Sequence, residues 1–401
     1  MKNTKSFTPD HRDITKQRTT VQVLVPIVLS VFAMYLTMGI ALGSLPGFIK
    51  NDLKSGNFII GTVIGLQSLS TLLTRAYAGK ITDTSGANTS NRYGVFIVLA
   101  AGMMYILAVS AAKITFLALG LLLIARIIHG IAESMLVTGS LTWGISLLGF
   151  QHSGKVMTWN GIAMYAGIAL GAPLSLWMNA QAGIMVSFSV IIFLAGVSWI
   201  STVTLPAVPV DPSFVRVPFY KITGKVSDQG LALAFSSMGF ACIASFIALL
   251  FEEKSWNHSS LSFFCFGGFY ILTRLLFSSY PDKFGGYKVA LVSFIIEIVG
   301  QLCIGFSVSG WMAIVGCALT GIGFSLVFPA LGVLAIRKIA PQMRGTALGA
   351  YSAFFDLSLG LAGPVAGLIA GWLSYQSVYI FGAFSCSSAI LILIKTKSRN
   401  P

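Results

Sequence analysis

The sequence predicts an all-α integral membrane protein with twelve transmembrane helices, arranged as two six-helix bundles related by pseudo-two-fold symmetry. Three observations predict this fold class. Of the 401 residues, 55% are hydrophobic and only 9% are charged, and the mean hydropathy is +0.84. Twelve apolar runs are long enough to cross a bilayer as helices, which takes about 20 residues. Finally, motifs of the first half return in the second half.

The apolar runs form two groups of six that are separated by a polar stretch. The first group lies near 21–47, 58–78, 93–112, 114–140, 156–178 and 184–205. The second group lies near 229–251, 259–278, 288–308, 311–335, 343–372 and 375–394. The first run is too long for the core of a signal peptide and has no small-residue cleavage site, so we expect it to be retained.

The polar segments predict the domain boundaries. We expect an N-terminal bundle at 21–205, a cytoplasmic linker at 206–228 and a C-terminal bundle at 229–394, with cytoplasmic tails at 1–20 and 395–401.

The net charge of +14 indicates topology rather than a nucleic-acid partner. With the N-terminus in the cytoplasm, only four of the 26 Lys and Arg residues fall in loops on the opposite side: Lys50, Lys54, Lys113 and Lys254. The positive-inside rule then places both termini in the cytoplasm. We expect a multi-pass protein of the cell inner or plasma membrane.

The sequence does not favour an enzyme or a metalloprotein. Four scattered histidines and five cysteines in apolar segments have no metal-ligand spacing, and no phosphate-binding Gly-x-x-x-x-Gly-Lys-Ser/Thr loop is present. We therefore expect no cofactor and no bound metal.

The two halves repeat each other at two constant shifts. Leu73-Thr74-Arg75 with Asp83 and Gly86 returns 199 positions later as Leu272-Thr273-Arg274 with Asp282 and Gly285. Gly130, Gly154 and Pro173 return 191 positions later as Gly321, Gly345 and Pro364. Two halves of one orientation predict a pseudo-two-fold axis along the membrane normal, with a solute path between them. This organisation favours a transporter.

Several motifs resemble those of the major facilitator superfamily (MFS). Gly79-Lys80-Ile81-Thr82-Asp83-Thr84-Ser85-Gly86 resembles the family's loop 2–3 signature, and Arg126-Ile127-Ile128-His129-Gly130 resembles the span-four signature of its drug/proton antiporter branch. The chain is also similar to poorly characterised bacterial permeases of the sugar- or drug-efflux type through Thr158-Trp159-Asn160-Gly161 and Asp356-Leu357-Ser358-Leu359-Gly360. It departs from the family where Ser278 replaces the leading glycine of the second loop copy and Ala172 splits the span-five Gly-Pro pair.

The repeated loop motif is a candidate for gating. Its residues are Arg75, Gly79, Asp83, Gly86, Arg274, Asp282 and Gly285. Asp83 and Asp282 could hold neighbouring helix ends, with Arg75 and Arg274 available as partners, and so favour one access state. A simple helix cap is the alternative.

A second set of small residues is a candidate for close helix packing. It consists of Gly161, Gly167, Gly171, Pro173, Gly363, Pro364 and Gly367. Gly167 with Gly171, and Gly363 with Gly367, have the small-xxx-small spacing that lets helix backbones approach closely. Packing alone and a direct part in coupling both remain open.

Of the twelve acidic residues, only Glu133, Glu297 and Asp356 fall inside apolar spans, and buried charges in a membrane are often functional. Arg126, His129 and Glu133 share nearly one helix face and should avoid lipid. Such carboxylates can gain or release a proton when their surroundings change. The proton-coupling candidates are Asp356 first, then Glu133, Arg126, His129 and Glu297.

Each of these candidates also has a structural interpretation. Glu133 could form a permanent ion pair with Arg126, His129 could be a hydrogen-bonded interhelical histidine, and Asp356 could hold a neighbouring helix. Glu297 lies in span nine, which the resemblance places at the periphery of the fold.

Polar and aromatic residues in the spans that line the path in this fold are candidate substrate contacts. They are Tyr35, Gln67, Trp159, Asn160, Tyr165, Phe324 and Phe328. Aromatic rings can stack on a solute, and amides can orient its polar groups. Ordinary packing is the alternative for each.

Together these features predict a monomeric secondary transporter that moves a small organic solute by alternating access. Proton-coupled efflux of a drug, a sugar or a metabolite such as a siderophore is the leading expectation, with the lipid bilayer and protons as partners. Import by proton symport is an alternative. A non-transporting sensor or a lipid-handling protein on the same scaffold is an alternative of another class.

Overall fold

The computed structural model describes residues 20–149, 152–208, 210, 220–337, 339 and 344–399. The elements in this part of the chain are helices, and twelve of them are long and apolar enough to cross a membrane. This confirms the predicted fold class.

Six of the long helices belong to the first half of the chain and six to the second. The first six are α2 (Thr20–Gly47), α3 (Asn57–Ser85), α4 (Ala87–Ser110), α5 (Thr115–Leu148), α6 (Ser153–Ala182) and α7 (Ile184–Thr202). The other six are α8 (Tyr220–Glu253), α9 (Ser259–Phe277), α11 (Gly286–Gly305), α12 (Gly310–Ile336), α13 (Arg344–Trp372) and α14 (Tyr375–Arg399). A short π-helix, η1 (Phe48–Asp52), extends α2, and a short helix, α10 (Tyr280–Phe284), precedes α11.

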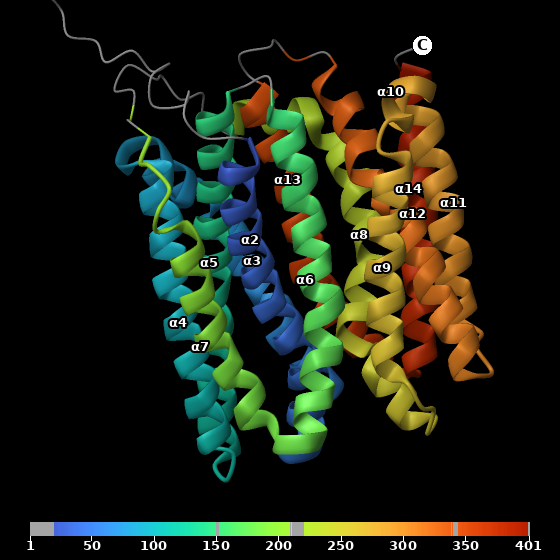
Figure 1. The fold of residues 1–401 in the computed structure, drawn as a ribbon. Helices are drawn as coiled ribbons and strands as arrows, with labels where there is room; N and C mark the ends of the chain where they lie inside the picture. Colours follow the sequence, from blue (N-terminus) through green and yellow to red (C-terminus); the bar gives the residue numbers. More distant parts are fainter. Residues whose placement is uncertain are drawn as a thin grey trace, which may run out of the picture.

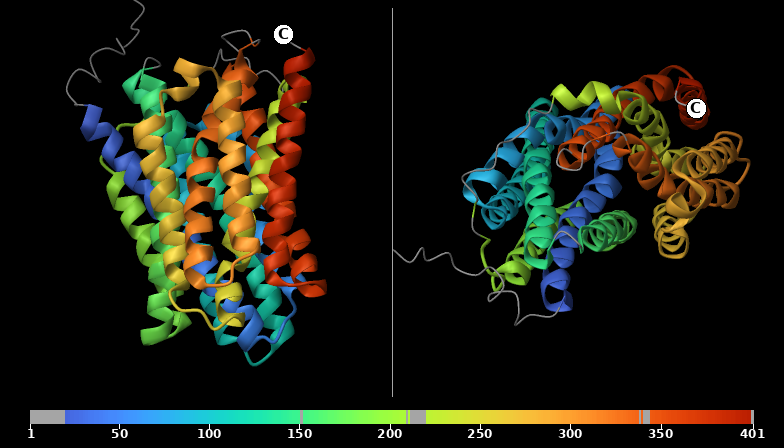
Figure 2. Two further views of the ribbon diagram at one scale, coloured as in Figure 1. Left: turned by 90° about the vertical axis from the view of Figure 1, so that its right-hand side faces the viewer. Right: turned by 90° about the horizontal axis from the view of Figure 1, so that it is seen from above.

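The two halves form separate bundles that lie side by side. Viewed from above, the blue-to-green helices occupy one side of the molecule and the yellow-to-red helices the other (Figure 2, right). Within the bundles, α2 packs on α6, α4 on α5, and α11 on α12. The described chain ends, at the start of α2 and the end of α14, lie on one face of the molecule (Figure 1).

Two helix pairs make most of the contact between the bundles: α3 with α13, and α6 with α9. Glycines form the α3–α13 seam. Gly61 lies against the backbone of Gly363, and Gly65 lies against that of Gly360, so a Cβ at either α3 position would collide with α13. Close approach of this kind is what small residues allow between membrane helices.

Gly167 and Gly171 serve a different contact, inside the N-terminal bundle. Both lie against the α2 backbone, where Gly39 faces Gly171. The two small-xxx-small pairs therefore join α6 to α2 and α13 to α3, while the side chain of Arg274 fills the space beside Gly161.

Two helices extend beyond the apolar runs that predicted them. Residues 79–85 belong to helix α3 rather than to a loop, and helix α8 begins at Tyr220, inside the predicted linker 206–228. Both predictions took the end of apolar sequence as the end of a helix. Backbone hydrogen bonds do not require apolar side chains, so a helix can continue past the hydrocarbon region.

Glycine, rather than a long loop, separates the helices at the repeated motif. Gly86 has a φ of 96° between α3 and α4, and Gly285 has a φ of 84° between α10 and α11. Positive φ costs glycine little, which explains why glycine stands in both copies. The half-buried Asp83 lies in the last turns of α3, whereas the side chain of Asp282 lies outside the described residues.

Polar contacts join the bundles on the face away from the chain ends. Asn51 of η1 donates a hydrogen bond to Glu252 of α8 (3.0 Å), and Tyr375 of α14 donates one to Asn57 of α3 (2.9 Å). The Lys50 ammonium lies 5.0 Å from the centre of the Tyr375 ring. The bundles are therefore fastened together on this face.

Candidate functional site

A buried ion pair between α3 and α13 connects the two bundles. A guanidinium nitrogen of Arg75 on α3 lies 2.5 Å from a carboxylate oxygen of Asp356 on α13. The Asp356 side chain is 5% exposed and that of Arg75 is 25% exposed. Arg75, which the sequence offered as one possible partner of Asp83, pairs across the bundles because it lies on the α3 face that packs against α13.

The second buried carboxylate, Glu133 on α5, receives three hydrogen bonds from its own bundle. Tyr35 on α2 donates to one carboxylate oxygen (2.9 Å). Gln67 and Thr71 on α3 donate to the other (3.1 and 3.0 Å). These three donors satisfy the hydrogen-bonding needs of a carboxylate that is buried among apolar helices.

One face of α3 connects the two carboxylates. Gln67, Thr71 and Arg75 are spaced four residues apart, so they lie on the same side of the helix. The first two contact Glu133 and the third contacts Asp356. Glu133 and Asp356 are close enough for their charges to interact. We call Gln67, Thr71 and Arg75, together with Tyr35 of α2, the α3 polar face.

Arg126 does not pair with Glu133, although the two share a helix face. Its guanidinium donates to the backbone carbonyls of Val63 (3.0 Å) and Ile64 (2.8 Å) on α3 and to the hydroxyl of Tyr105 (3.3 Å). Residues seven apart on a helix are separated by about 10 Å along its axis. The predicted alternative of a permanent Arg126–Glu133 ion pair is therefore wrong.

His129 is fully buried and links three helices of the N-terminal bundle. Its Nε2 lies 3.0 Å from the Thr37 hydroxyl of α2, and its Nδ1 lies 3.1 Å from the Tyr105 hydroxyl of α4. This geometry is that of a hydrogen-bonded interhelical histidine. Its part in proton coupling stays a prediction.

Glu297 lies apart from the other two acids, inside the C-terminal bundle. It is fully buried on α11, where Ser236 of α8 donates a hydrogen bond (2.5 Å) and the Cys386 thiol of α14 lies 3.4 Å away. These contacts tie three helices of one bundle together. Any role of Glu297 in coupling would have to act through the packing of that bundle.

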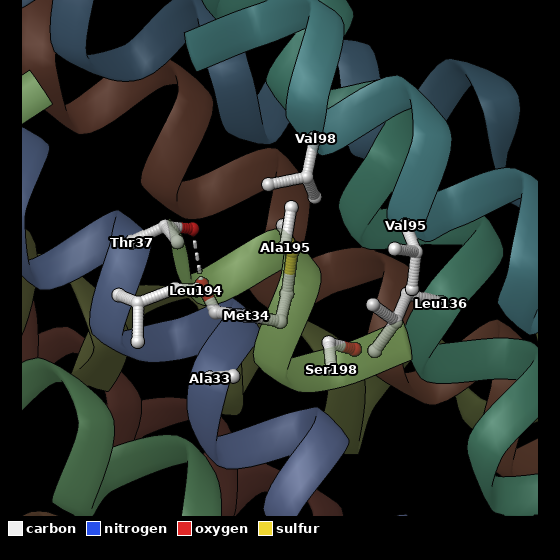
Figure 3. A pocket seen from close by; sticks show the side chains of 9 residues that line it. All are labelled: Ala33, Met34, Thr37, Val95, Val98, Leu136, Leu194, Ala195 and Ser198. Carbon is white, nitrogen blue, oxygen red and sulfur yellow. Dashed lines mark hydrogen bonds between the residues drawn. The ribbon is translucent and has the colours of Figure 1, made fainter. Parts of the chain in front are cut away.

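The N-terminal bundle has no acid at the matching place. Val98, 199 positions before Glu297, lines a small gap between α2, α4, α5 and α7 (Figure 3). The lining is apolar apart from Thr37 and Ser198, and the gap has no room for a water molecule. It is a packing gap rather than a solute site.

Aromatic rings gather where the two bundles meet on the other side of the interface. Tyr165 of α6 stacks on Tyr270 of α9 with 3.7 Å between ring centres, and Phe324 of α12 lies 6.1 Å from both rings. Phe355 of α13 stacks on Phe324 at 6.3 Å. Tyr165, Tyr270, Phe324 and Phe355 are hereafter the aromatic cluster.

Arg274 borders this cluster. Its guanidinium carbon lies 5.3 Å from the centre of the Tyr270 ring, and its Nη2 donates to the carbonyl of Ser325 (2.9 Å). Among the described residues, no acidic side chain forms an ion pair with Arg274. The expected partner, Asp282, has a side chain outside the described residues.

The remaining predicted substrate contacts lie in different surroundings. Asn160 is 4% exposed, and among the described residues neither atom of its amide group has a hydrogen-bond partner. Phe328 packs on Tyr351 with ring centres 5.1 Å apart, and Trp159 is 42% exposed. Tyr35 and Gln67 bind Glu133 rather than standing free. These substrate roles stay predictions.

Sequence reasoning missed several residues of the site, including the following three. Thr71 binds Glu133, Tyr270 carries the aromatic cluster, and Tyr105 joins Arg126 to His129. The four-residue spacing of Thr71 from Gln67 and Arg75 was a usable signal for the first. For the other two, the sequence contains only a tyrosine in an apolar span.

The described residues contain no group of three His, Cys, Asp or Glu side chains that could hold a metal ion. The polar groups of the site are instead carboxylates, hydroxyls, amides and guanidinium groups that can exchange hydrogen bonds and charge partners when helices move.

The chain is similar to known membrane proteins over almost its whole length. The profile of the Major Facilitator Superfamily matches residues 27–220 and 230–401. An uncharacterized MFS-type transporter of Pseudomonas aeruginosa is 38% identical over 397 residues, which is 98% of each chain. The Escherichia coli K12 protein YhhS, also an uncharacterized MFS-type transporter, is 37% identical over 378 residues, covering 94% of this chain and 93% of YhhS.

Solved structures of lower identity share the fold. A D-xylose–proton symporter aligns with a TM-score of 0.76 at 15% identity, covering 92% of this chain and 96% of the symporter. The nucleoside transporter NupG aligns with a TM-score of 0.66 at 17% identity, covering 94% of this chain and 99% of NupG. With twelve spans in two bundles and a profile match along both halves, the chain belongs to the major facilitator superfamily and is a membrane transporter.

Proposed function

We propose that this transporter moves a small organic solute against its gradient by coupling to protons, and that its physiological direction is efflux. The single observation that carries the proposal is the α3 polar face, which joins two membrane-buried carboxylates. Glu133 is held within one bundle, and Asp356 reaches the same helix from the other bundle.

The coupling follows from what bundle separation does to Asp356. While α3 and α13 are in contact, Arg75 neutralises the carboxylate. When the helices part, Asp356 loses that cation in a setting where an uncompensated charge is costly, so it takes up a proton. When they close again, Arg75 recovers the carboxylate and the proton leaves. The protonation of Asp356 is therefore linked to whether α3 and α13 are in contact.

Glu133 is the second carboxylate in this mechanism. Its donors Gln67 and Thr71 lie on the helix that carries Arg75, so movement of α3 alters both carboxylates together. Efflux rests on the resemblance of residues 126–130 to the span-four signature of drug/proton antiporters. We propose a monomer as the working unit, because the site is built from the two bundles of one chain.

The experiment is solute-driven proton flux in proteoliposomes that contain the purified full-length protein and an internal pH dye. The solute panel consists of sugars, organic acids, siderophores and cationic drugs. In the wild-type protein, a transported solute should move protons, and the sign of the flux distinguishes antiport from symport. Asp356→Asn and Glu133→Gln should insert and fold but should lose the pH dependence of transport.

Asp228→Asn is the matched control, because it removes an acid whose neighbour is the Thr396 hydroxyl rather than a cation of the interface. It should behave as wild type. Full activity with an intact pH response in both Asp356→Asn and Glu133→Gln would contradict proton coupling. If a solute is transported at the same rate with and without a pH gradient, the protein is a transporter but the proposed coupling to protons is contradicted.

A further inference from the structure

The two repeated arginines stand at equivalent places but have unequal partners. Arg75 and Arg274 are 199 positions apart and lie on equivalent helices, α3 and α9. Each helix packs against the opposite bundle, α3 on α13 and α9 on α6. The interface therefore contains the same type of contact twice, related by the pseudo-two-fold axis.

The residue that should neutralise Arg274 is replaced by an aromatic one. Helices α6 and α13 repeat at the shift of 191, which relates Pro173 to Pro364. At that shift the equivalent of Asp356 is Tyr165. Where one copy of the contact has an Arg–Asp ion pair, the other therefore has an arginine beside a tyrosine.

Among the residues that the structure describes, no anion lies beside Arg274. Its contacts are the Ser325 carbonyl, the Tyr270 ring and the space beside Gly161, and it lies within electrostatic range of Tyr165. A carbonyl and a ring face are weaker partners than a carboxylate. Inside a membrane protein, an arginine usually faces the bundle interior or a solute path, where it pairs with an anion or with backbone carbonyls.

The aromatic rings near Arg274 indicate which other groups a ligand at this place would carry. The Tyr270 ring lies next to the guanidinium and stacks on Tyr165, and Phe324 and Phe355 continue the aromatic cluster. Rings stack on flat apolar groups and leave polar groups to be bound elsewhere. A solute with a ring and one anionic group matches this arrangement.

From this asymmetry we propose that the transported solute is an aromatic carboxylate whose anionic group pairs with Arg274 and whose ring lies on the aromatic cluster. This rests on the proposed function and names its substrate class. In the other copy of the contact, Asp356 supplies the negative charge that neutralises Arg75. Here the bound solute supplies that charge to Arg274, next to Tyr165. Binding would therefore strengthen the α6–α9 contact as Asp356 strengthens the α3–α13 contact.

The test compares acids with their amides, which have nearly the same shape but no charge. Purified full-length protein in a neutral detergent is titrated with phenylacetate and phenylacetamide, and with indole-3-acetate and indole-3-acetamide, and thermal unfolding reports binding. The acids should bind and the amides should bind roughly tenfold or more weakly, as expected for loss of a charge-assisted hydrogen bond. Equal binding of acid and amide would overturn the proposal.

Two sets of variants locate the site. Arg274→Gln should weaken acid binding roughly tenfold or more, while Arg92→Gln, whose guanidinium lies over the Trp199 ring, should not. Tyr165→Asp gives Arg274 the internal carboxylate that Arg75 has, so it should also abolish acid binding, whereas the uncharged Tyr165→Asn should retain more of it. Acid binding that is undiminished in both Arg274→Gln and Tyr165→Asp would refute the assignment.

Anions from other sources are included as competitors. Inorganic phosphate and phosphatidylglycerol carry negative charge but no aromatic ring. If these anions protect the protein against thermal unfolding and the acids do not, Arg274 is a lipid or phosphate contact and the proposal is overturned. The binding assay uses no pH gradient. Acid binding without proton flux would contradict the coupling alone, and proton flux driven only by cationic or sugar solutes would contradict the substrate class alone.

Discussion

At the scale of single residues, the pair Arg75–Asp356 stands out because each partner is costly without the other. Removing one member of a buried pair leaves an uncompensated charge, which typically destabilises a protein by about 3–5 kcal/mol. Here the cost should be nearer the lower end, because a quarter of the Arg75 side chain is exposed. Under the proposed mechanism, this contact favours one access state and is released when Asp356 takes up a proton.

A double-mutant cycle measures this dependence. We expect Arg75→Gln and Asp356→Asn each to lower the free energy of unfolding by about 2–4 kcal/mol, and the double variant to lose less than the sum of the two. The measurement is unfolding in mixed micelles with increasing sodium dodecyl sulfate. Strictly additive losses would show that the two side chains do not stabilise each other.

At the scale of elements, the α3–α13 seam depends on glycine. The backbones of Gly61 and Gly363 are so close that a side chain on either would separate the helices. The ion pair of Arg75 and Asp356 lies farther along the same two helices. The close approach of the glycines thus sets the distance at which the charges meet.

Gly363→Val tests this seam against a control in the same helix. Gly363→Val should insert and fold but reduce transport at least tenfold, because the added methyl groups meet the Gly61 backbone. Gly371→Val places the same side chain where a Cβ meets nothing within 4 Å, and it should transport like wild type. Solute uptake in proteoliposomes, normalised to inserted protein, provides the comparison. Equal rates in the two variants would dissociate the seam from transport.

At the scale of the whole molecule, the structure represents one state of the proposed access cycle. The bundles are fastened on the face away from the chain ends by Asn51 with Glu252 and by Asn57 with Tyr375. Alternating access requires these contacts to break when the solute leaves or enters through that face. They are polar and few, which suits contacts that must open in every cycle.

Cross-linking this face should stop the cycle. In a background without the five native cysteines, Asn51→Cys with Glu252→Cys should be joined by a short bifunctional thiol reagent, because the native side chains touch at 3.0 Å. Cross-linking should reduce transport to the background level. If the reagent contains a cleavable disulfide, reducing that disulfide should restore transport. Either single-cysteine variant treated in the same way should keep its activity. A cross-linked protein that still transports at the full rate would show that this face does not open.

The sequence alone was sufficient for the architecture because membrane insertion is decided locally. Apolar runs of spanning length identify twelve helices whatever their partners are, and a constant shift between motifs reveals two related halves. The intramembrane acids Glu133, Glu297 and Asp356 were recognisable for the same reason, since a charge in an apolar run is visible without a structure. Helix ends were less predictable, as α3 and α8 show, because hydrophobicity marks the lipid boundary and not the end of the helix.

Only the tertiary structure decided which charges meet. The sequence offered Arg75 as a possible partner of Asp83 in its own motif, but Arg75 pairs with Asp356 of the other half, and its repeat Arg274 lies beside the Tyr270 ring. Arg126 and Glu133 share a helix face but bind different helices. Such pairings depend on how two bundles rotate and approach each other. Packing between distant segments sets that geometry, and local sequence does not encode it.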